Sequence, residues 1–465
     1  MTMYKVFIVI QLFAIARAVG QSYHFPLSMP DDKLGVRYDA RMDSGRVACL
    51  FQPSGKYVKP SIYRKVFLGE DLRPIDSVDF VVPGRAWLVA VESNDRYTIH
   101  VFYSSQNPLF VSKKDFYQFI VTWKSGKILS SFMKTAVDLS PYIHTRFIGP
   151  GLVTLNFVEN KGSPEILILK FRYNNVNDGM IYPGKTAAFS VHDGRLVWVL
   201  DDIYLLKIVS TEDELIGLTS TDSEKPVYTI HFFSKENGKK LRSQQLDHSQ
   251  NFRIISVFAT NGQEVMIAGT EFPRNNGKDY EKNGHFYMSL FDFEGKLIVE
   301  QTDTTTRLSS KRMHTLGYVF DRDGNLILIG EGWKKDYSLL GFKIVGNIFT
   351  SILLGESSDI KPDEEITSLF MAKISPDDAG VKDFSTFAIG PWLTFSDVIT
   401  DGEHVLIKNG NDVLLFDPNE IQKAPVNFTT RTMSAELVLS PYGPITLTPD
   451  RKSMAMQFLH SKEQQ

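Results

Sequence analysis

The chain has 465 residues, of which 43% are hydrophobic and 12% aromatic. This composition excludes an intrinsically disordered chain and favours strands, because aromatic side chains pack well on a pleated surface. The formal net charge of −3 shows no excess of basic residues, so we expect no binding to nucleic acid.

The N-terminus has the pattern of a secretory signal peptide. Lys5 precedes an apolar run, Val6–Ile15, and small residues follow as far as Gly20. A basic residue, an apolar stretch and a small-residue exit are typical of a cleaved leader. We therefore expect residues 1–20 to be removed and the protein to be exported, either to the periplasm or outside the cell. A membrane anchor is the alternative, but the run is short for crossing a bilayer, so we expect no membrane span.

The chain has a single cysteine, Cys49, so it forms no intramolecular disulfide. Cys49 lies in the apolar run Val47–Phe51, which predicts a small buried hydrophobic side chain. Stability must therefore come from core burial and strand pairing.

Short apolar runs alternate with turn sequences such as Asn261-Gly262, and helical periodicity is weak. Asn-Gly and Asp-Gly pairs accept the positive φ angles of tight hairpins. Two hairpin-like segments, Leu88–Phe102 and Leu215–Phe233, are near copies that share the sequence Tyr-Thr-Ile-His. Looser copies fill the rest of the chain at a mean spacing of roughly 60 residues, with one unit between the two near copies.

A second pattern follows several of these hairpins. An aromatic or apolar strand end leads into a short turn, then Gly-Lys or Gly-Arg, which predicts the turn into an outer strand. It occurs at residues 123–128, 191–196, 234–239 and 291–297.

Hairpins with added outer strands predict four-stranded antiparallel blades, and one such blade cannot bury both of its faces alone. We therefore expect an all-β fold with a single β-propeller over residues 21–465. The count of repeats gives seven four-stranded blades. Six or eight blades remain open because residues 340–400 are irregular. Spare strands in Val36–Val58 and a lone inner strand at Met454–Leu459 predict that N- and C-terminal strands close the ring in one composite blade.

Two segments resemble turns of known propeller families. Phe189–Trp198 is similar to the blade repeat of the quinoprotein-like (PQQ-like) β-propellers, and Asp323–Leu328 resembles turns of six-bladed NHL-type propellers. The resemblance covers isolated blade turns only, so it implies an architecture and no activity. A single cysteine excludes the vicinal disulfide found in some quinoprotein dehydrogenases.

No linear motif of catalysis is present in the chain. The sequence lacks a nucleophile elbow, a His-Glu-x-x-His zinc motif, a P-loop and a dinucleotide fingerprint. The segment Asp321–Asn325 does not have the spacing of a calcium loop. We therefore expect no metal and no cofactor. An enzyme remains open, because a propeller can assemble a site from several blades without any linear motif.

Two histidines, His100 and His231, occupy the same position in the two near copies. They are candidate ligands of a shared site, since histidine is a common ligand and acid–base group. We favour the alternative, in which each histidine belongs to its own blade. Alternation places His100 on the strand face of Thr98 and Phe102.

Two polar segments, Glu271–Gly284 and Glu331–Tyr337, are predicted to be loops on the face of the propeller that usually carries a ligand. A tryptophan beside cations and carboxylates can stack on a sugar or grip a peptide. The candidate ligand-binding residues are Glu271, Arg274, Glu331, Trp333 and Lys334. The alternative is that both segments are solvated loops without a ligand.

The sequence thus predicts a monomeric binding or scaffold module for an unknown protein, peptide or glycan. A propeller enzyme, such as a glycan hydrolase, a glycan lyase or a lactone hydrolase, is the alternative. Asn427-Phe428-Thr429 is the single glycosylation sequon.

Overall fold

The structure is a computed structural model. It describes residues 22–26, 38–43, 46–53, 60–93, 96–104, 116–135, 138, 153–158, 166–174, 181–200, 203, 205–221, 227–246, 251–273, 285–303, 313–336, 363–392, 397–400, 404–430, 436–440, 443–450 and 453–459. The predicted leader, residues 1–20, lies outside the described residues.

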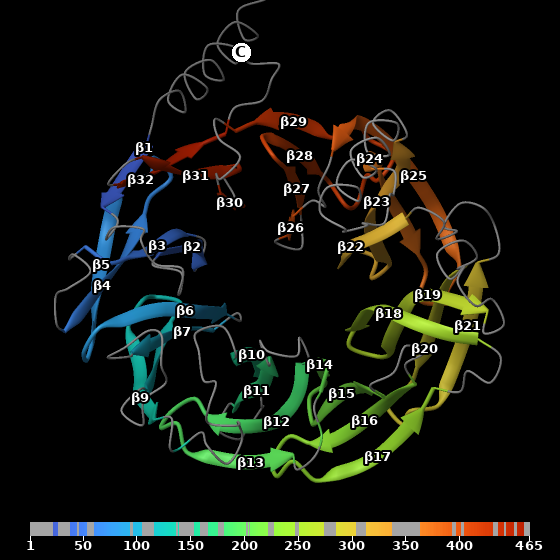
Figure 1. Ribbon diagram of the computed structural model, residues 1–465, viewed down its shortest axis with the longest axis horizontal. Coiled ribbons are helices and arrows are strands. Elements are labelled where there is room, and N and C mark those ends of the chain that lie inside the picture. The colour runs from blue at the N-terminus through green and yellow to red at the C-terminus, as the bar shows by residue number, and fades with distance from the viewer. Residues whose placement is uncertain are drawn as a thin grey trace, which may run out of the picture. The chain divides into compact units, whose positions relative to one another are not determined.

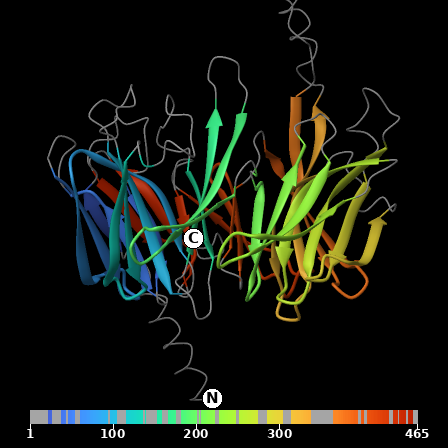
Figure 2. The ribbon, with the colours of Figure 1, turned by 90° about the horizontal axis from the view of Figure 1, so that it is seen from below.

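The described residues form 32 strands in eight four-stranded antiparallel sheets, which confirms the predicted all-β class (Figure 1). The chain divides into two compact units, and each is described by itself. The first unit comprises the described residues within 1–220, 228–245 and 430–460, and the second those within 246–429 together with a few flanking residues. Figure 2 shows the strands of each sheet lying side by side.

The first unit contains five of the sheets found in the described residues. One sheet orders its strands as β1 (Ser22–Pro26), β32 (Ser453–Phe458), β31 (Ile445–Asp450) and β30 (Glu436–Val438). The next two are β2 (Tyr38–Asp43), β3 (Arg46–Phe51), β4 (Ser61–Leu68) and β5 (Pro74–Val82), then β6 (Ala86–Ser93), β7 (Tyr97–Ser104), β8 (Phe116–Trp123) and β9 (Ile128–Thr135). The last two are β10 (Val153–Val158), β11 (Ile166–Asn174), β12 (Ile181–Ser190) and β13 (Leu196–Leu200), then β14 (Lys207–Ser210), β15 (Glu214–Ser220), β16 (Tyr228–Ser234) and β17 (Lys240–Gln245).

The second unit contains the other three sheets of the described part of the chain. The first has β18 (Asn251–Thr260), β19 (Val265–Pro273), β20 (His285–Phe291) and β21 (Leu297–Asp303). The second has β22 (Met313–Phe320), β23 (Leu326–Asp336), β24 (Asp363–Ile374) and β25 (Val381–Trp392). The third has β26 (Asp397–Thr400), β27 (Val405–Asn409), β28 (Asp412–Phe416) and β29 (Val426–Thr429).

The two ends of the chain share one sheet, as predicted. Strand β1 pairs with β32 from Ser22 opposite Gln457 to Pro26 opposite Ser453. The segment that contributes differs from the prediction, because Val36–Val58 supplies β2 and β3 of a complete sheet of its own. This extra sheet explains why the described residues contain eight sheets where the sequence count gave seven.

The two near copies do not occupy equivalent places in their sheets. Leu88–Phe102 spans the first and second strands, β6 and β7, whereas Leu215–Phe233 spans the second and third strands, β15 and β16. The equivalence assumed from the repeat is therefore wrong. Hairpins of similar sequence form the first and second strands in one sheet and the second and third strands in the other. This is possible because every hairpin of an antiparallel sheet needs the same alternation and the same kind of turn. One sheet lies between the copies in sequence, as predicted.

The predicted turns into outer strands are confirmed. All four join the third strand of a sheet to the fourth, as in β8–β9, β12–β13, β16–β17 and β20–β21. The glycine of each turn has a positive φ, which other residues adopt only with strain. These angles are 91° at Gly126, 68° at Gly194, 68° at Gly238 and 86° at Gly295.

Three of these glycines in the first unit also touch an aromatic ring of the preceding sheet. A Cβ atom on each would lie 2.3–2.8 Å from a ring atom, well inside van der Waals contact. The pairs are Gly126 with Phe67, Gly194 with Phe132, and Gly238 with Trp198. The indole Nε1 of Trp198 also donates to the carbonyl of Lys235 at 2.8 Å. A glycine turn against an aromatic ring of the preceding sheet is therefore a recurrent contact between successive sheets of the first unit.

Hydrophobic clusters fill the space between successive sheets within each unit. Trp87 of the β6-β7-β8-β9 sheet and Phe189 of the β10-β11-β12-β13 sheet belong to one cluster. In the second unit, Met288 on β20 and Leu328 on β23 share another. Cys49 is fully buried, as predicted, with its Sγ 3.7 Å from Sδ of Met456 on β32. Each sheet thus supplies core for its neighbour.

Candidate functional site

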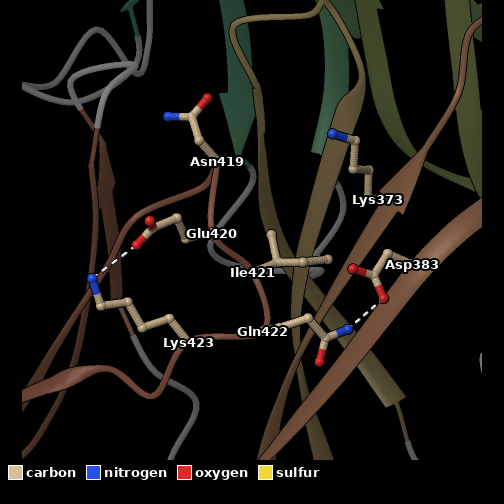
Figure 3. A pocket seen from close by; sticks show the side chains of 7 residues that line it. All are labelled: Lys373, Asp383, Asn419, Glu420, Ile421, Gln422 and Lys423. Atoms are coloured by element: carbon tan, nitrogen blue, oxygen red, sulfur yellow. Dashed lines mark hydrogen bonds and ion pairs between the residues drawn. The ribbon is translucent and has the colours of Figure 1, made fainter.

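A polar pocket lies in the second unit, between the sheet β22-β23-β24-β25 and the turn that joins β28 to β29. It has a volume of about 400 Å³. Its lining residues are Lys373, Asp383, Asn419, Glu420, Ile421, Gln422 and Lys423 (Figure 3). We call it the turn pocket.

One wall of the turn pocket comes from two neighbouring strands. Lys373 on β24 pairs in register with Asp383 on β25, so both residues lie on the same face of the sheet. Met371, two residues before Lys373, packs in the cluster shared with the β26-β27-β28-β29 sheet. Alternation therefore directs Lys373 and Asp383 toward that sheet and its turn.

The other wall is the turn at 417–423, which begins with the sequence Asp-Pro-Asn that is typical of turns. The backbone N–H and the side-chain amide of Asn419 donate to Oδ1 of Asp417 at 2.8 and 2.9 Å. The Oδ1 atom of Asn419 in turn accepts from the backbone N–H of Arg322 at 3.0 Å. Ile421 is 4% exposed and anchors the turn in the apolar cluster. The hydrogen bonds of Asn419 and the burial of Ile421 thus fix the turn in place.

The exposed polar groups of the turn pocket form two local pairs (Figure 3). Nζ of Lys423 lies 2.9 Å from Oε2 of Glu420, and this hydrogen bond raises the pKa of Lys423. The side-chain amide of Gln422 reaches across and donates to Oδ1 of Asp383. An exposed ion pair such as Lys423–Glu420 stabilises a fold little, so a ligand can replace one of its partners at a low cost in free energy.

Lys373 is the most firmly placed charge of the turn pocket. Its Nζ lies 2.6 Å from Oδ2 of Asp321, a residue that is 7% exposed. Burial by itself would raise the pKa of Asp321, but hydrogen bonds from Lys373 and Asn325 outweigh burial and hold the pKa below its usual value. Asp321 is therefore ionised at neutral pH and holds the side chain of Lys373 in place at the pocket wall.

The turn pocket is built from connections other than the two segments selected from the sequence. The connection 321–325 joins the first and second strands of its sheet, and the turn at 417–423 lies between the third and fourth strands of the next. None of the lining residues belongs to a connection between a second and a third strand. The Asp-Pro-Asn sequence that begins at Asp417 was the available signal for this site, and the search for catalytic motifs missed it.

Glu271, a predicted ligand-binding residue, belongs to an ion-pair network within the β18-β19-β20-β21 sheet. Arg253 is 5% exposed and donates to Oε1 of Glu271 at 2.9 Å. It also donates to the two carboxylate oxygens of Glu300 at 2.7 and 2.8 Å. Thr302 donates to Oε2 of Glu271 at 3.1 Å. Both oxygens of Glu271 thus have partners inside the sheet, and its contact with a ligand stays a prediction.

Glu331, the second predicted acid, is fully buried on β23. Ala268 and Leu328 lie in the cluster between the two sheets that carry Glu271 and Glu331. Glu271 follows Ala268 by three residues on β19, and Glu331 follows Leu328 by three on β23. Because side chains alternate between the two faces of a strand, each glutamate lies on the face turned away from that cluster. The structure therefore does not bring these two glutamates together.

The other predicted site residues fall in a strand or outside the described residues. The segment 331–336 continues β23 and pairs with β24 down to Asp336 opposite Asp363, so the prediction of a loop there is wrong. Lys334 and Lys335 pair in register with Glu365 and Glu364 of β24. Trp333 lies on the same strand, and Arg274 lies outside the described residues. Ligand binding by Trp333, Lys334 and Arg274 stays a prediction.

The two repeat histidines lie on different strands of different sheets, as the alternative reading favoured. His100 on β7 is 1% exposed, with the ring of Phe80 at 5.2 Å. Burial first, and then the charges of Lys65 and Arg41, hold the pKa of His100 well below 6.5. His231 on β16 is bonded to Oγ1 of Thr219 at 3.0 Å. Each histidine thus has its own surroundings.

Within the described ranges, no three or more histidine, cysteine, aspartate or glutamate side chains gather as a metal site would require. Across the same part of the chain, no helix has the length and apolar character needed to cross a membrane.

The chain matches no protein-family model and no curated protein. Solved structures similar to it include the polysaccharide lyase Uly1, with a TM-score of 0.44, 11% identity, and coverage of 80% of this chain and 89% of that one. They also include the β-propeller domain of the Trilobed protease from Pyrococcus furiosus, described as having an open velcro topology, with a TM-score of 0.39, 8% identity, and coverage of 81% and 97%. The Neurospora crassa Pan2 WD40 domain has a TM-score of 0.38, 10% identity, and coverage of 83% and 91%. β-Propellers are thus among the similar structures, and likenesses this low carry no argument about activity.

Proposed function

We propose that residues 21–465 form a single β-propeller with eight blades, closed by the pairing of β1 with β32, and that residues 1–20 direct its export. The repeated four-stranded sheets, the clusters between successive sheets and the sheet shared by both chain ends support this architecture. The basic residue and apolar run at the N-terminus support export. The choice between periplasm and extracellular space, and the monomeric state, stay predictions.

We infer that the protein is a binding module whose turn pocket holds a polar segment of a protein or peptide. The observation that carries this inference is the pocket itself, which presents Lys373 and Asp383 from two strands opposite Glu420 and Lys423. The turn that carries Glu420 and Lys423 is fixed by hydrogen bonds. A segment carrying both charges can exchange each local pair for one of its own. Sugar rings are usually held by stacking on aromatic faces, and the seven lining residues contain none, so the lining favours a peptide over a glycan.

A displayed library of random peptides tests this function. The purified wild-type protein and the double variant Gln422→Ala/Lys423→Ala are each used to select peptides. We expect the wild type to enrich peptides that carry both acidic and basic residues, and the double variant to bind those peptides at least about tenfold more weakly, a loss of about 1.4 kcal/mol. Equal binding by the two proteins would contradict a role for the turn pocket.

The matched control is Lys382→Ala. Lys382 forms an exposed ion pair with Asp378 at 2.6 Å, much as Lys423 pairs with Glu420, but it does not line the turn pocket. We expect this variant to bind the selected peptides as the wild type does. A glycan array probed with the same proteins separates the two ligand classes, and the enzyme alternative stays a prediction.

A further inference from the structure

We propose that Asn427 carries an N-linked glycan. The sequence Asn427-Phe428-Thr429 is the one Asn-x-Ser/Thr sequence among the 465 residues. Such a sequence is the acceptor for N-glycosylation in the secretory pathway of eukaryotes. The proposal rests on the export proposed above, and Asn427 is not among the residues that line the turn pocket.

The structure places the acceptor where a glycan fits the folded chain. Asn427 and Thr429 are both exposed on β29, and alternation puts them on the same face of the strand. Between them, Phe428 is 6% exposed and holds the strand to the protein. The side-chain amide of Asn427 and the hydroxyl of Thr429, which the modifying enzyme must recognise, are thus both open to solvent. Phe428, between them, anchors the strand.

The place of β29 in its sheet leaves room for an oligosaccharide. In the sheet β26-β27-β28-β29, it is the terminal strand, and in the described part of the chain it pairs with β28 only. Its register sets Asn427 opposite Leu414 and Thr429 opposite Asp412. The preceding residue, Val426, is 46% exposed, so the surface on that side of the acceptor is open.

The chemistry requires a lipid-diphosphate-linked oligosaccharide as the co-reactant. The side-chain amide nitrogen of Asn427 attacks the anomeric carbon of the first sugar. The new N–C bond forms as the bond from that carbon to the diphosphate oxygen breaks. The lipid diphosphate leaves with the electron pair, and the amide nitrogen loses one proton to a base of the modifying enzyme.

Expression of the full chain in cultured eukaryotic cells tests the proposal, followed by mass measurement with and without peptide N-glycosidase. Two versions are made, one with the chain's own residues 1–20 and one with an established secretion leader in their place. We expect one glycan on the wild type and on Thr429→Ser, which keeps the acceptor. We expect none on Asn427→Gln or on Thr429→Ala. Because the replaced side chains are exposed, all variants should be secreted at similar levels.

The two leaders separate the failure of this inference from the failure of the export proposal. A wild-type protein that enters the secretory pathway with either leader and has the mass of the bare chain would overturn the glycan. A glycan present only with the substituted leader would support the modification of Asn427 and overturn export by residues 1–20. A glycan that persists on Asn427→Gln would also overturn the proposal, since another residue would carry it.

Discussion

At the residue scale, the buried His100 links the stability of the fold to pH. The side chain lies between two sheets of the first unit and is 1% exposed. Tyr63 and Phe80 belong to the apolar cluster between these two sheets, and alternation puts Lys65 on the same face as Tyr63, which is the side of His100. The guanidinium group of Arg41 donates to the carbonyl of Val91 at 3.4 Å. Protonation would bury a third cation in this space, which explains why burial, and then Lys65 and Arg41, hold its pKa far below 6.5.

The sign of the effect follows from this lowered pKa. Below about pH 6.5 the unfolded chain binds a proton at His100 and the folded chain does not, so stability falls as the pH falls. We expect the free energy of unfolding to drop by up to about 1.4 kcal/mol per pH unit between pH 6.5 and the folded pKa. His100→Gln should flatten this slope in denaturant titrations at pH 7, 6 and 5. Parallel curves for the variant and the wild type would contradict this account of the histidine.

His231→Gln is the control for that measurement. Burial first, and then Lys240, lower the pKa of His231, but the ring is half-buried and lies beside Thr219. The slope should therefore change less than with His100→Gln. An equal effect of both substitutions would show that burial between the sheets is not the cause.

At the scale of elements, three glycine turns of the first unit also pack against an aromatic ring of the preceding sheet. Gly194 combines a φ of 68° with a ring of Phe132 that a Cβ would approach to 2.3 Å. Gly194→Ala should lower the free energy of unfolding by about 2–4 kcal/mol, because it adds backbone strain to a clash with a packed ring. Denaturant unfolding of the purified variant measures this loss.

Gly324→Ala separates the two causes. Gly324 has a φ of 79°, and a Cβ there would meet no atom within 4 Å. The loss of stability should be about 1–2 kcal/mol, from the left-handed backbone alone. If Gly194→Ala costs no more than Gly324→Ala, the contact with Phe132 does not hold the sheets together.

The same elements show what the sequence can predict and what it cannot. The turns into outer strands were predicted because alternation, a Gly with positive φ and a following apolar residue are local features. The place of a hairpin in its sheet was not, because Leu88–Phe102 and Leu215–Phe233 share the local pattern at different strand positions. The ion pair of Glu271 with Arg253 could not be predicted either, because only the register of β18 and β19 places the two residues opposite each other.

At the scale of the whole molecule, the number of sheets depended on which segments pair at the chain ends. Strand β1, at Ser22–Pro26, is short and closely follows the predicted leader, so nothing local marks it as the partner of β32. The segment Val36–Val58 carries the stronger strand pattern and was assigned to that place instead. The candidate site was missed for a similar reason, because the turn pocket joins residues from 373 to 423 that only the packing of two sheets brings together.

The central claim is that the eight sheets of the described residues form one closed propeller. A crystal structure of the protein tests this proposed closure. We expect eight four-stranded sheets in sequence around a single axis, with β1 beside β32 completing the ring. A ring of seven sheets, or two separate arcs of sheets without closure, would contradict the account.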